Sequence, residues 1–208
     1  MVDAKSHFTF SHSVGVTWVA SAIGEAMGLN PERKQLLHRA ALLHDLGKLR
    51  VPNSILDKPC NLDADEWQIM REHPGLTGSI LRRVKQFREL ASIAGSHHEK
   101  LDGSGYPNGL HAEEIPLETR ILTVSDIYTA LTEDRPYRAG YSHEQAIEIM
   151  IHESPDKLDA DCFEALRSAA EALNWNASAP AQPTLAPPIP AHKSKGTGRV
   201  ESQPSIAQ

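Results

Sequence analysis

The segment PERKQLLHRAALLHDLG, residues 31–47, carries the clearest structural signal in the chain. Its apolar residues recur three, four and seven positions apart, which is the spacing of one face of an α-helix. Asn30 can cap the start of this helix, Pro31 suits its first position, and Gly47 can end it. We therefore predict an amphipathic helix from Pro31 to Leu46, with a His-Asp pair in its last turn.

Outward from this segment, other stretches show the same periodicity, and none shows the alternation of β-branched residues that is typical of a strand. Capping-box-like pairs open two further helices, at Asp63 and at Ser142, and Pro74 breaks the first of them. Periodic runs at 117–131 and 159–173 predict two more. The fold class is therefore predicted to be all-α.

Composition limits the domain count and the class of partner. The chain has 208 residues, with 27 Asp and Glu against 21 Lys and Arg, so its formal charge is −6. An acidic balance argues against a broad basic surface for DNA or RNA, so no nucleic-acid polymer is expected as a partner. From residue 177 onward Pro, Ala, Ser and Lys dominate without apolar periodicity. We predict one domain at 1–176 and a disordered Pro/Ala/Ser-rich tail at 177–208.

The cysteines and the apolar segments indicate the compartment. Cys60 and Cys162 are too far apart for a Cys-x-x-Cys motif and too few for a disulfide framework. The N-terminal residues lack the apolar core of an export signal, and no stretch approaches the roughly 20 apolar residues of a membrane span. A cytoplasmic protein without a membrane partner is predicted.

Histidine is the unusual feature, with eleven residues in the chain. His44 and Asp45 are adjacent, and adjacent side chains on a helix diverge by about 100°, so the two can flank a metal site without completing it. Imidazoles mixed with carboxylates suit Fe, Mn, Zn, Ni or Co better than Ca or Mg. Two such ions bridged by a carboxylate can clamp both oxygens of an in-line phosphoryl displacement. Further candidate ligands near helix ends or at polar breaks in apolar stripes are His12, His73, His97, His98 and Asp126.

The order of several motifs resembles a known family, the HD-GYP domain, over roughly Phe8 to Leu166. Its members belong to the HD superfamily of metal-dependent phosphohydrolases. The motifs are His44-Asp-Leu-Gly-Lys48, Val51-Pro-Asn-Ser-Ile-Leu-Asp-Lys-Pro59, Glu72-His-Pro74, His97-His-Glu-Lys-Leu-Asp-Gly-Ser-Gly-Tyr-Pro107, Arg120-Ile-Leu-Thr-Val-Ser-Asp126 and Asp134-Arg-Pro-Tyr-Arg138.

The resemblance implies a helical HD-domain bundle with an irregular loop at 98–115, which binds two or three Fe or Mn ions and hydrolyses cyclic di-GMP. Asp45 would bridge the metals, and Lys48 would reach a phosphate oxygen or the nucleophile. The implied metal ligands are His12, His44, Asp45, His73, His97, His98 and Asp126. The implied substrate contacts are Lys48, Gly103, Tyr106, Arg135 and Arg138.

A structural role is the alternative for several of these residues. The glycines of the loop can serve only to permit its turn, with Tyr106 as an anchor. Arg135 and Arg138 can pair with acidic neighbours such as Glu133. A lone histidine at a helix end is more often a cap than a ligand.

Three departures from the family pattern modify the expectation. Phe8 stands where members with a third metal carry Glu, which predicts a dinuclear centre of Fe or Mn. Thr129 stands where many members carry a second Asp, which predicts a tuned rate. Only eleven residues precede His12, so the start is either truncated or belongs to a minimal version of the domain.

The predicted function is hydrolysis of cyclic di-GMP to pGpG, with GMP as a further product, in bacterial second-messenger signalling. One alternative keeps the chemistry and changes the substrate to another cyclic dinucleotide, such as a mixed cyclic GMP-AMP. A second is a non-hydrolysing sensor or docking module, in which the loop around 103–107 contacts partner proteins such as diguanylate cyclases.

Overall fold

The computed structural model describes residues 7–134, 139–153 and 156–172, and every regular element in these ranges is helical. The predicted all-α class is confirmed. A single antiparallel bridge, between Asp102 and His111, is the extent of β pairing among them. The α-helices are α1 (His7–Ala26), α2 (Pro31–Leu43), α3 (Asn53–Leu56), α4 (Ala64–Arg71), α5 (His73–Leu81), α6 (Arg88–Ala94), α7 (Leu117–Thr132), α8 (His143–Ile151) and α9 (Ala160–Ala172). Three 3-10 helices are η1 (Leu46–Arg50), η2 (Lys85–Phe87) and η3 (Ala112–Glu114).

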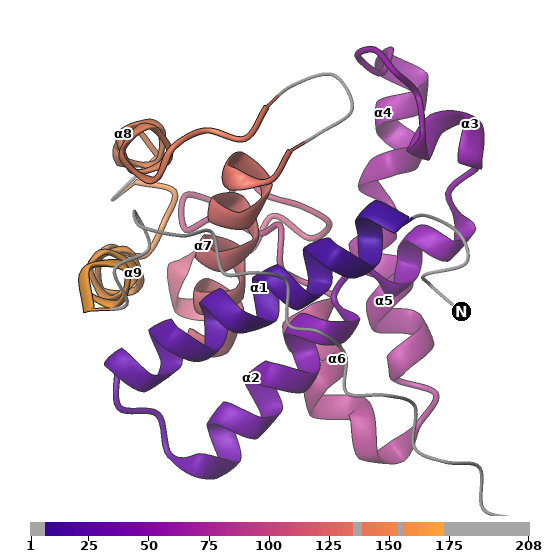
Figure 1. Ribbon diagram of the computed structural model, residues 1–208. Coiled ribbons are helices and arrows are strands. Elements are labelled where there is room, and N and C mark those ends of the chain that lie inside the picture. The colour runs from indigo at the N-terminus through magenta and orange to yellow at the C-terminus, as the bar shows by residue number, and fades with distance from the viewer. Residues whose placement is uncertain (1–6, 135–138, 154–155, 173–208) are drawn as a thin grey trace, which may run out of the picture.

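Helix α1 is the centre of the packing (Figure 1). It crosses α2 and also packs against α7 and α9, while α5 and α6 form a second layer that meets η1, α2 and α7. Buried Val16, Val19 and Ile23 form one stripe of α1, spaced by three and four residues. His12 extends this stripe by one turn and is itself buried, so an imidazole stands where the apolar pattern would place another core residue.

The predicted helix starts are confirmed in detail. Asp63 and Ser142 each form a complete capping box at the start of α4 and α8. Pro74 lies in the first turn of α5, and the chain breaks between α4 and α5 as expected. The helix predicted at 117–131 appears as α7, one residue longer, and the helix predicted at 159–173 appears as α9, which begins one residue later and is described as far as Ala172.

The helix that carries His44 and Asp45 is shorter than predicted, because α2 ends at Leu43 and 3-10 helix η1 follows. Contact with α5 explains the difference. The hydroxyl of Thr77 donates to the carbonyl of His44 at 2.8 Å and accepts from the backbone N–H of Gly47 at 2.8 Å. A Cβ atom at Gly47 would lie 2.0 Å from a backbone oxygen of α5. Glycine is thus required there for close approach of two backbones, and it does not act as the helix stop that we predicted.

Several predictions lie outside the described residues. The tail at 177–208 is one, and Arg135 and Arg138 are two others. In the part of the chain that is described, no helix combines the length and the apolar character needed to cross a bilayer.

Candidate metal centre

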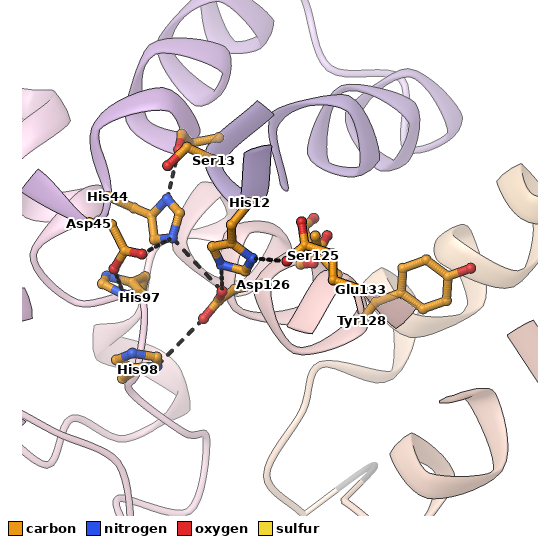
Figure 2. Close-up of polar contacts among 12 residues, drawn as sticks. His12, Ser13, His44, Asp45, His97, His98, Ser125, Asp126, Tyr128 and Glu133 are labelled. Carbon is orange, nitrogen blue, oxygen red and sulfur yellow. Dashed lines mark hydrogen bonds and ion pairs between the residues drawn. The ribbon is translucent and has the colours of Figure 1, made fainter. Parts of the chain in front are cut away.

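Five segments far apart in the sequence bring the predicted metal ligands together. They are α1, the turn after α2, the start of α5, the turn after α6, and the middle of α7. All seven candidates lie in this one cluster, and all but His98 are buried. Figure 2 shows how the side chains of His12, His44, Asp45 and Asp126 converge from opposite sides.

Three of the histidines share one local geometry. In each, ring atom Nδ1 lies 2.7 Å from the carbonyl oxygen three residues earlier, so Nδ1 carries the proton and Nε2 is available to the cluster. The pairs are His44 with Ala41, His73 with Met70, and His97 with Ala94. Because the acceptors are backbone atoms of the preceding turn, the end of a helix is what orients each ligand.

Asp45 lies between these rings. Its Oδ1 is 3.2 Å from Nε2 of His73 and 4.0 Å from Nε2 of His97. Its Oδ2 is 3.5 Å from Nε2 of His44 and 2.6 Å from Nζ of Lys48. The turn after α2 therefore directs two adjacent side chains into one cluster, which a continued helix would have kept about 100° apart. A carboxylate with both oxygens so placed can bridge two ions.

Two buried atoms test whether the cluster fits a metal. Within the described part of the chain, Nε2 of His44 and Oδ1 of Asp45 are fully buried and have no hydrogen-bond partner. An unsatisfied buried polar atom costs about 1–3 kcal/mol, so such atoms point to a missing partner. A metal cation coordinated by both the ring nitrogen and the carboxylate oxygen would be a partner for these two atoms. The residues fit a transition-metal ion.

The ligand atoms fall into three overlapping groups, each with its atoms within 4.8 Å of one another. The groups are His73, His97 and His98; His12, His44 and Asp126; and His44, Asp45 and His97. The third group shares His44 with one of the others and His97 with the other. These overlapping groups would supply ligands for more than one ion.

The carboxylates of the cluster are ionised. Burial alone would raise the pKa of Asp45, but the ammonium of Lys48 holds it well below its usual range. Burial likewise opposes ionisation of Asp126, and a hydrogen bond from His12 outweighs it and lowers the pKa of that carboxyl. Anionic oxygens at both ends of the cluster favour a cation between them.

Most rings of the cluster are neutral, as metal ligands must be. Burial lowers the pKa of His44, lowers that of His97 well below the ordinary value, and lowers the pKa of His98 to about 3. His12 differs. Burial would lower its pKa too, but hydrogen bonds to Asp126 and Glu133 raise it to about 9.

The loop that follows His98 forms the outer wall of the site. The ring of Tyr106 lies 4.8 Å from the ring of His98, centroid to centroid. Gly103 has a φ of +76°, and a Cβ atom at Gly105 would lie 2.3 Å from the backbone nitrogen of Lys100. Both glycines are therefore needed for the turn itself, which supports the structural alternative for Gly103.

Three residues beside the site were not singled out by the sequence. Glu99 is buried, and its carboxylate accepts from the backbone N–H groups of Asn108 and Leu110. The guanidinium of Arg71 lies 4.6 Å above the ring centre of Tyr106. Glu133 accepts from His12. Glu99 follows the His97-His98 pair directly, which is a usable signal, whereas Arg71 and Glu133 stand just outside the quoted motifs.

Of the two positions that depart from the family pattern, the structure describes the side chain of one. Thr129 is buried, and its hydroxyl donates to the carbonyl of Ser125 at 2.8 Å within α7. The side chain of Phe8 lies outside the described part, so the dinuclear expectation that it supports stays a prediction.

Known proteins with similar sequences indicate the family to which this cluster of side chains belongs. The family described as "HD domain" matches residues 1–162. The chain is 45% identical over 173 residues to 3′3′-cGAMP-specific phosphodiesterase 3 of Vibrio cholerae, covering 83% of this chain and 38% of the relative. It is 39% identical over 150 residues to the cyclic di-GMP phosphodiesterase response regulator RpfG of Xanthomonas campestris, covering 71% and 40%. The chain therefore spans about two-fifths of the length of these relatives.

A solved structure agrees in fold. The HDG"Y"P protein Bd1817 of Bdellovibrio bacteriovorus superposes with a TM-score of 0.67 at 21% identity, covering 80% of this chain and 53% of that one. A helical bundle with adjacent His and Asp at the centre of an imidazole and carboxylate cluster defines the HD class of domain. Within this class, the chain belongs to the HD-GYP family.

Proposed function

We propose that the chain is a metal-dependent phosphodiesterase that hydrolyses a cyclic dinucleotide. The observation that carries the proposal is the pair of orphaned buried atoms, Nε2 of His44 and Oδ1 of Asp45, within a cluster of neutral imidazoles and ionised carboxylates. The names of the relatives supply the substrate class, because they include both cyclic di-GMP and 3′3′-cGAMP phosphodiesterases.

Seven side chains would hold two ions of Fe or Mn, with Asp45 between them. They are His12, His44, Asp45, His73, His97, His98 and Asp126. When bound, such ions activate water and neutralise charge on phosphoryl oxygens. The protein itself supplies orientation, because three of the rings are locked by backbone hydrogen bonds before any ligand arrives.

The ammonium of Lys48 borders the centre. Its side chain is 23% exposed, and its Nζ lies 2.6 Å from Oδ2 of Asp45. An ammonium at this boundary can neutralise Asp45 in the free protein and donate to a phosphate oxygen when a dinucleotide is bound. Tyr106 would bound the substrate on the side of the loop, and Arg135 and Arg138 would contact its phosphates or guanine edges.

The proposed products are pGpG from cyclic di-GMP, with GMP from a second cut, or the linear dinucleotide from 3′3′-cGAMP. We assign turnover to residues 1–176. Docking of diguanylate cyclase-type proteins on the loop stays a prediction from the resemblance.

A substrate panel with metal analysis tests the proposal. The purified chain is loaded anaerobically with Mn²⁺ or Fe²⁺, its metal content is measured, and cyclic di-GMP, 3′3′-cGAMP and cyclic di-AMP are offered in parallel. We expect about two ions per chain and linear product from at least one substrate. Asp45→Asn should lose turnover, whereas Asp57→Asn, which changes an exposed carboxylate, should not.

Two results would contradict the proposal. Metal-loaded protein that leaves all three dinucleotides intact would favour the non-hydrolysing module. Full turnover by Asp45→Asn would show that hydrolysis does not require a carboxylate at position 45.

A further inference from the structure

His12 is oriented in a different way from the other buried histidines. Those rings donate Nδ1–H to backbone carbonyls three residues earlier in the chain, whereas Nδ1 of His12 lies 2.8 Å from Oε2 of Glu133, which is 121 residues away in the chain. Its Nε2 lies 2.9 Å from Oδ1 of Asp126. The ring is thus held between two carboxylates, and the partner of Nδ1 is a side chain that substitution can remove.

Helix α7 supplies both carboxylates. Asp126 and Glu133 are seven residues apart, about two helical turns, so they leave the same side of the helix with room for one imidazole between them. Glu133 is the residue directly after α7, and its backbone N–H donates to the carbonyl of Thr129 at 3.0 Å, which closes the last turn. Figure 2 shows Glu133 and Asp126 on opposite sides of His12.

Helix α1 leaves space for the Glu133 carboxylate. Gly15 lies nearly one turn beyond His12, and a Cβ atom there would lie 3.4 Å from Oε1 of Glu133 and 2.9 Å from Cγ2 of Thr129. A side chain at position 15 would therefore press on the end of α7. The absence of one lets the carboxylate settle against α1 beside the ring.

We propose that Glu133 is a positioning residue for the metal centre, which holds His12 with Nδ1 protonated and Nε2 directed at the ion shared with Asp126 and His44. The inference rests on the proposed metal-dependent function. An acceptor at one ring nitrogen selects the tautomer that leaves the other free, and a carboxylate acceptor also makes the ring a stronger ligand. Thr129 does not take this role, because Nδ1 of His12 bonds to Glu133 and the Thr129 hydroxyl donates to the carbonyl of Ser125.

The test measures metal affinity and needs no substrate. Glu133→Ala, Glu133→Gln and the wild-type chain are compared by competition with a chelator for Mn²⁺, together with the number of ions bound. Loss of such an outer contact typically weakens metal binding about 10–100-fold, so we expect this loss for one of the bound ions in Glu133→Ala. Glu133→Gln, which keeps an acceptor oxygen without the charge, should fall between Glu133→Ala and wild type. Glu148→Ala, which removes an exposed carboxylate of α8, is the control and should bind like wild type.

The outcomes separate this inference from the proposed function. Equal Mn²⁺ affinity in wild type and Glu133→Ala would overturn the inference, as would a loss in Glu133→Gln as large as that in Glu133→Ala. If Glu133→Ala fails to fold, Glu133→Gln alone decides, through a measurable loss or none. The expected affinity differences without hydrolysis of any cyclic dinucleotide would uphold the inference and refute the phosphodiesterase. A wild-type chain that binds no divalent ion would refute both.

Discussion

Replacing Glu99 by glutamine should loosen the loop that carries Tyr106 without touching the metal ligands. Glu99 is 1% exposed, so its interactions are made away from water. Oε1 accepts from the backbone N–H of Asn108 at 2.7 Å, and Oε2 accepts from that of Leu110 at 3.0 Å. A glutamine has one acceptor oxygen, and its NH₂ group would face the second backbone N–H as donor against donor.

The magnitude follows from these two contacts. A hydrogen bond to a charged group contributes about 1.5–3 kcal/mol, and one of the two is lost outright in Glu99→Gln. Other contacts of the loop include backbone hydrogen bonds from Tyr106 to the carbonyl of His98 at 3.1 Å and from Ala112 to that of Leu101 at 3.0 Å. They should preserve the overall path. We expect the free energy of unfolding to fall by about 2 kcal/mol.

Urea unfolding and amide hydrogen exchange measure the effect. Exchange at Asn108 and Leu110 should accelerate about 30-fold if opening of the loop becomes easier by the same 2 kcal/mol. The Michaelis constant for the dinucleotide should rise, because the loop that carries Tyr106 is held less firmly. Glu113→Gln, an exposed change in the same loop, is the matched control. Unchanged exchange at both amides in Glu99→Gln would refute the reasoning.

Three further predictions concern the mouth of the site, pH and metal. Arg71→Ala removes the guanidinium above Tyr106, so we expect the Michaelis constant for an anionic dinucleotide to rise about tenfold, with kcat little changed. An unaltered Michaelis constant in steady-state assays would exclude a contact between Arg71 and the substrate. Burial opposes ionisation of Asp159, but hydrogen bonds from the Cys162 backbone N–H and from Arg120 hold its pKa below the ordinary value of 3.8. Ionised Asp159 therefore stabilises the folded state above about pH 3.8, and this stabilisation is lost as pH falls through the lower folded-state pKa. The difference in unfolding free energy between wild type and Asp159→Asn should shrink in acid. A constant difference would contradict this. Chelation of metal-loaded protein should abolish turnover and lower the melting temperature, since ions at about 100 times their Kd stabilise the folded state by about 2.7 kcal/mol; a melting temperature indifferent to chelator would argue against ions in the cluster.

Much of the architecture could be predicted because it depends on local chemistry. The capping boxes at Asp63 and Ser142 specify helix starts through contacts three residues apart, and they occur in the structure as expected. Helix α1 was not delimited in advance. It is rich in Ser, Thr, Gly and β-branched residues, whose helix propensity is modest, so packing against α2, α7 and α9 stabilises it.

For the metal cluster too, some features follow from the sequence and others from tertiary packing. The sequence by itself determined the chemical set, since imidazoles and carboxylates in this order indicate a transition-metal site, and all seven candidates converge. Only the tertiary structure decided how they are held. The end of α2 at Leu43 depends on Thr77 and a backbone contact at Gly47, and the orientation of His12 depends on Glu133, which is 121 residues away. Periodicity and capping report on neighbours within a turn or two, whereas these contacts exist only once distant helices have packed.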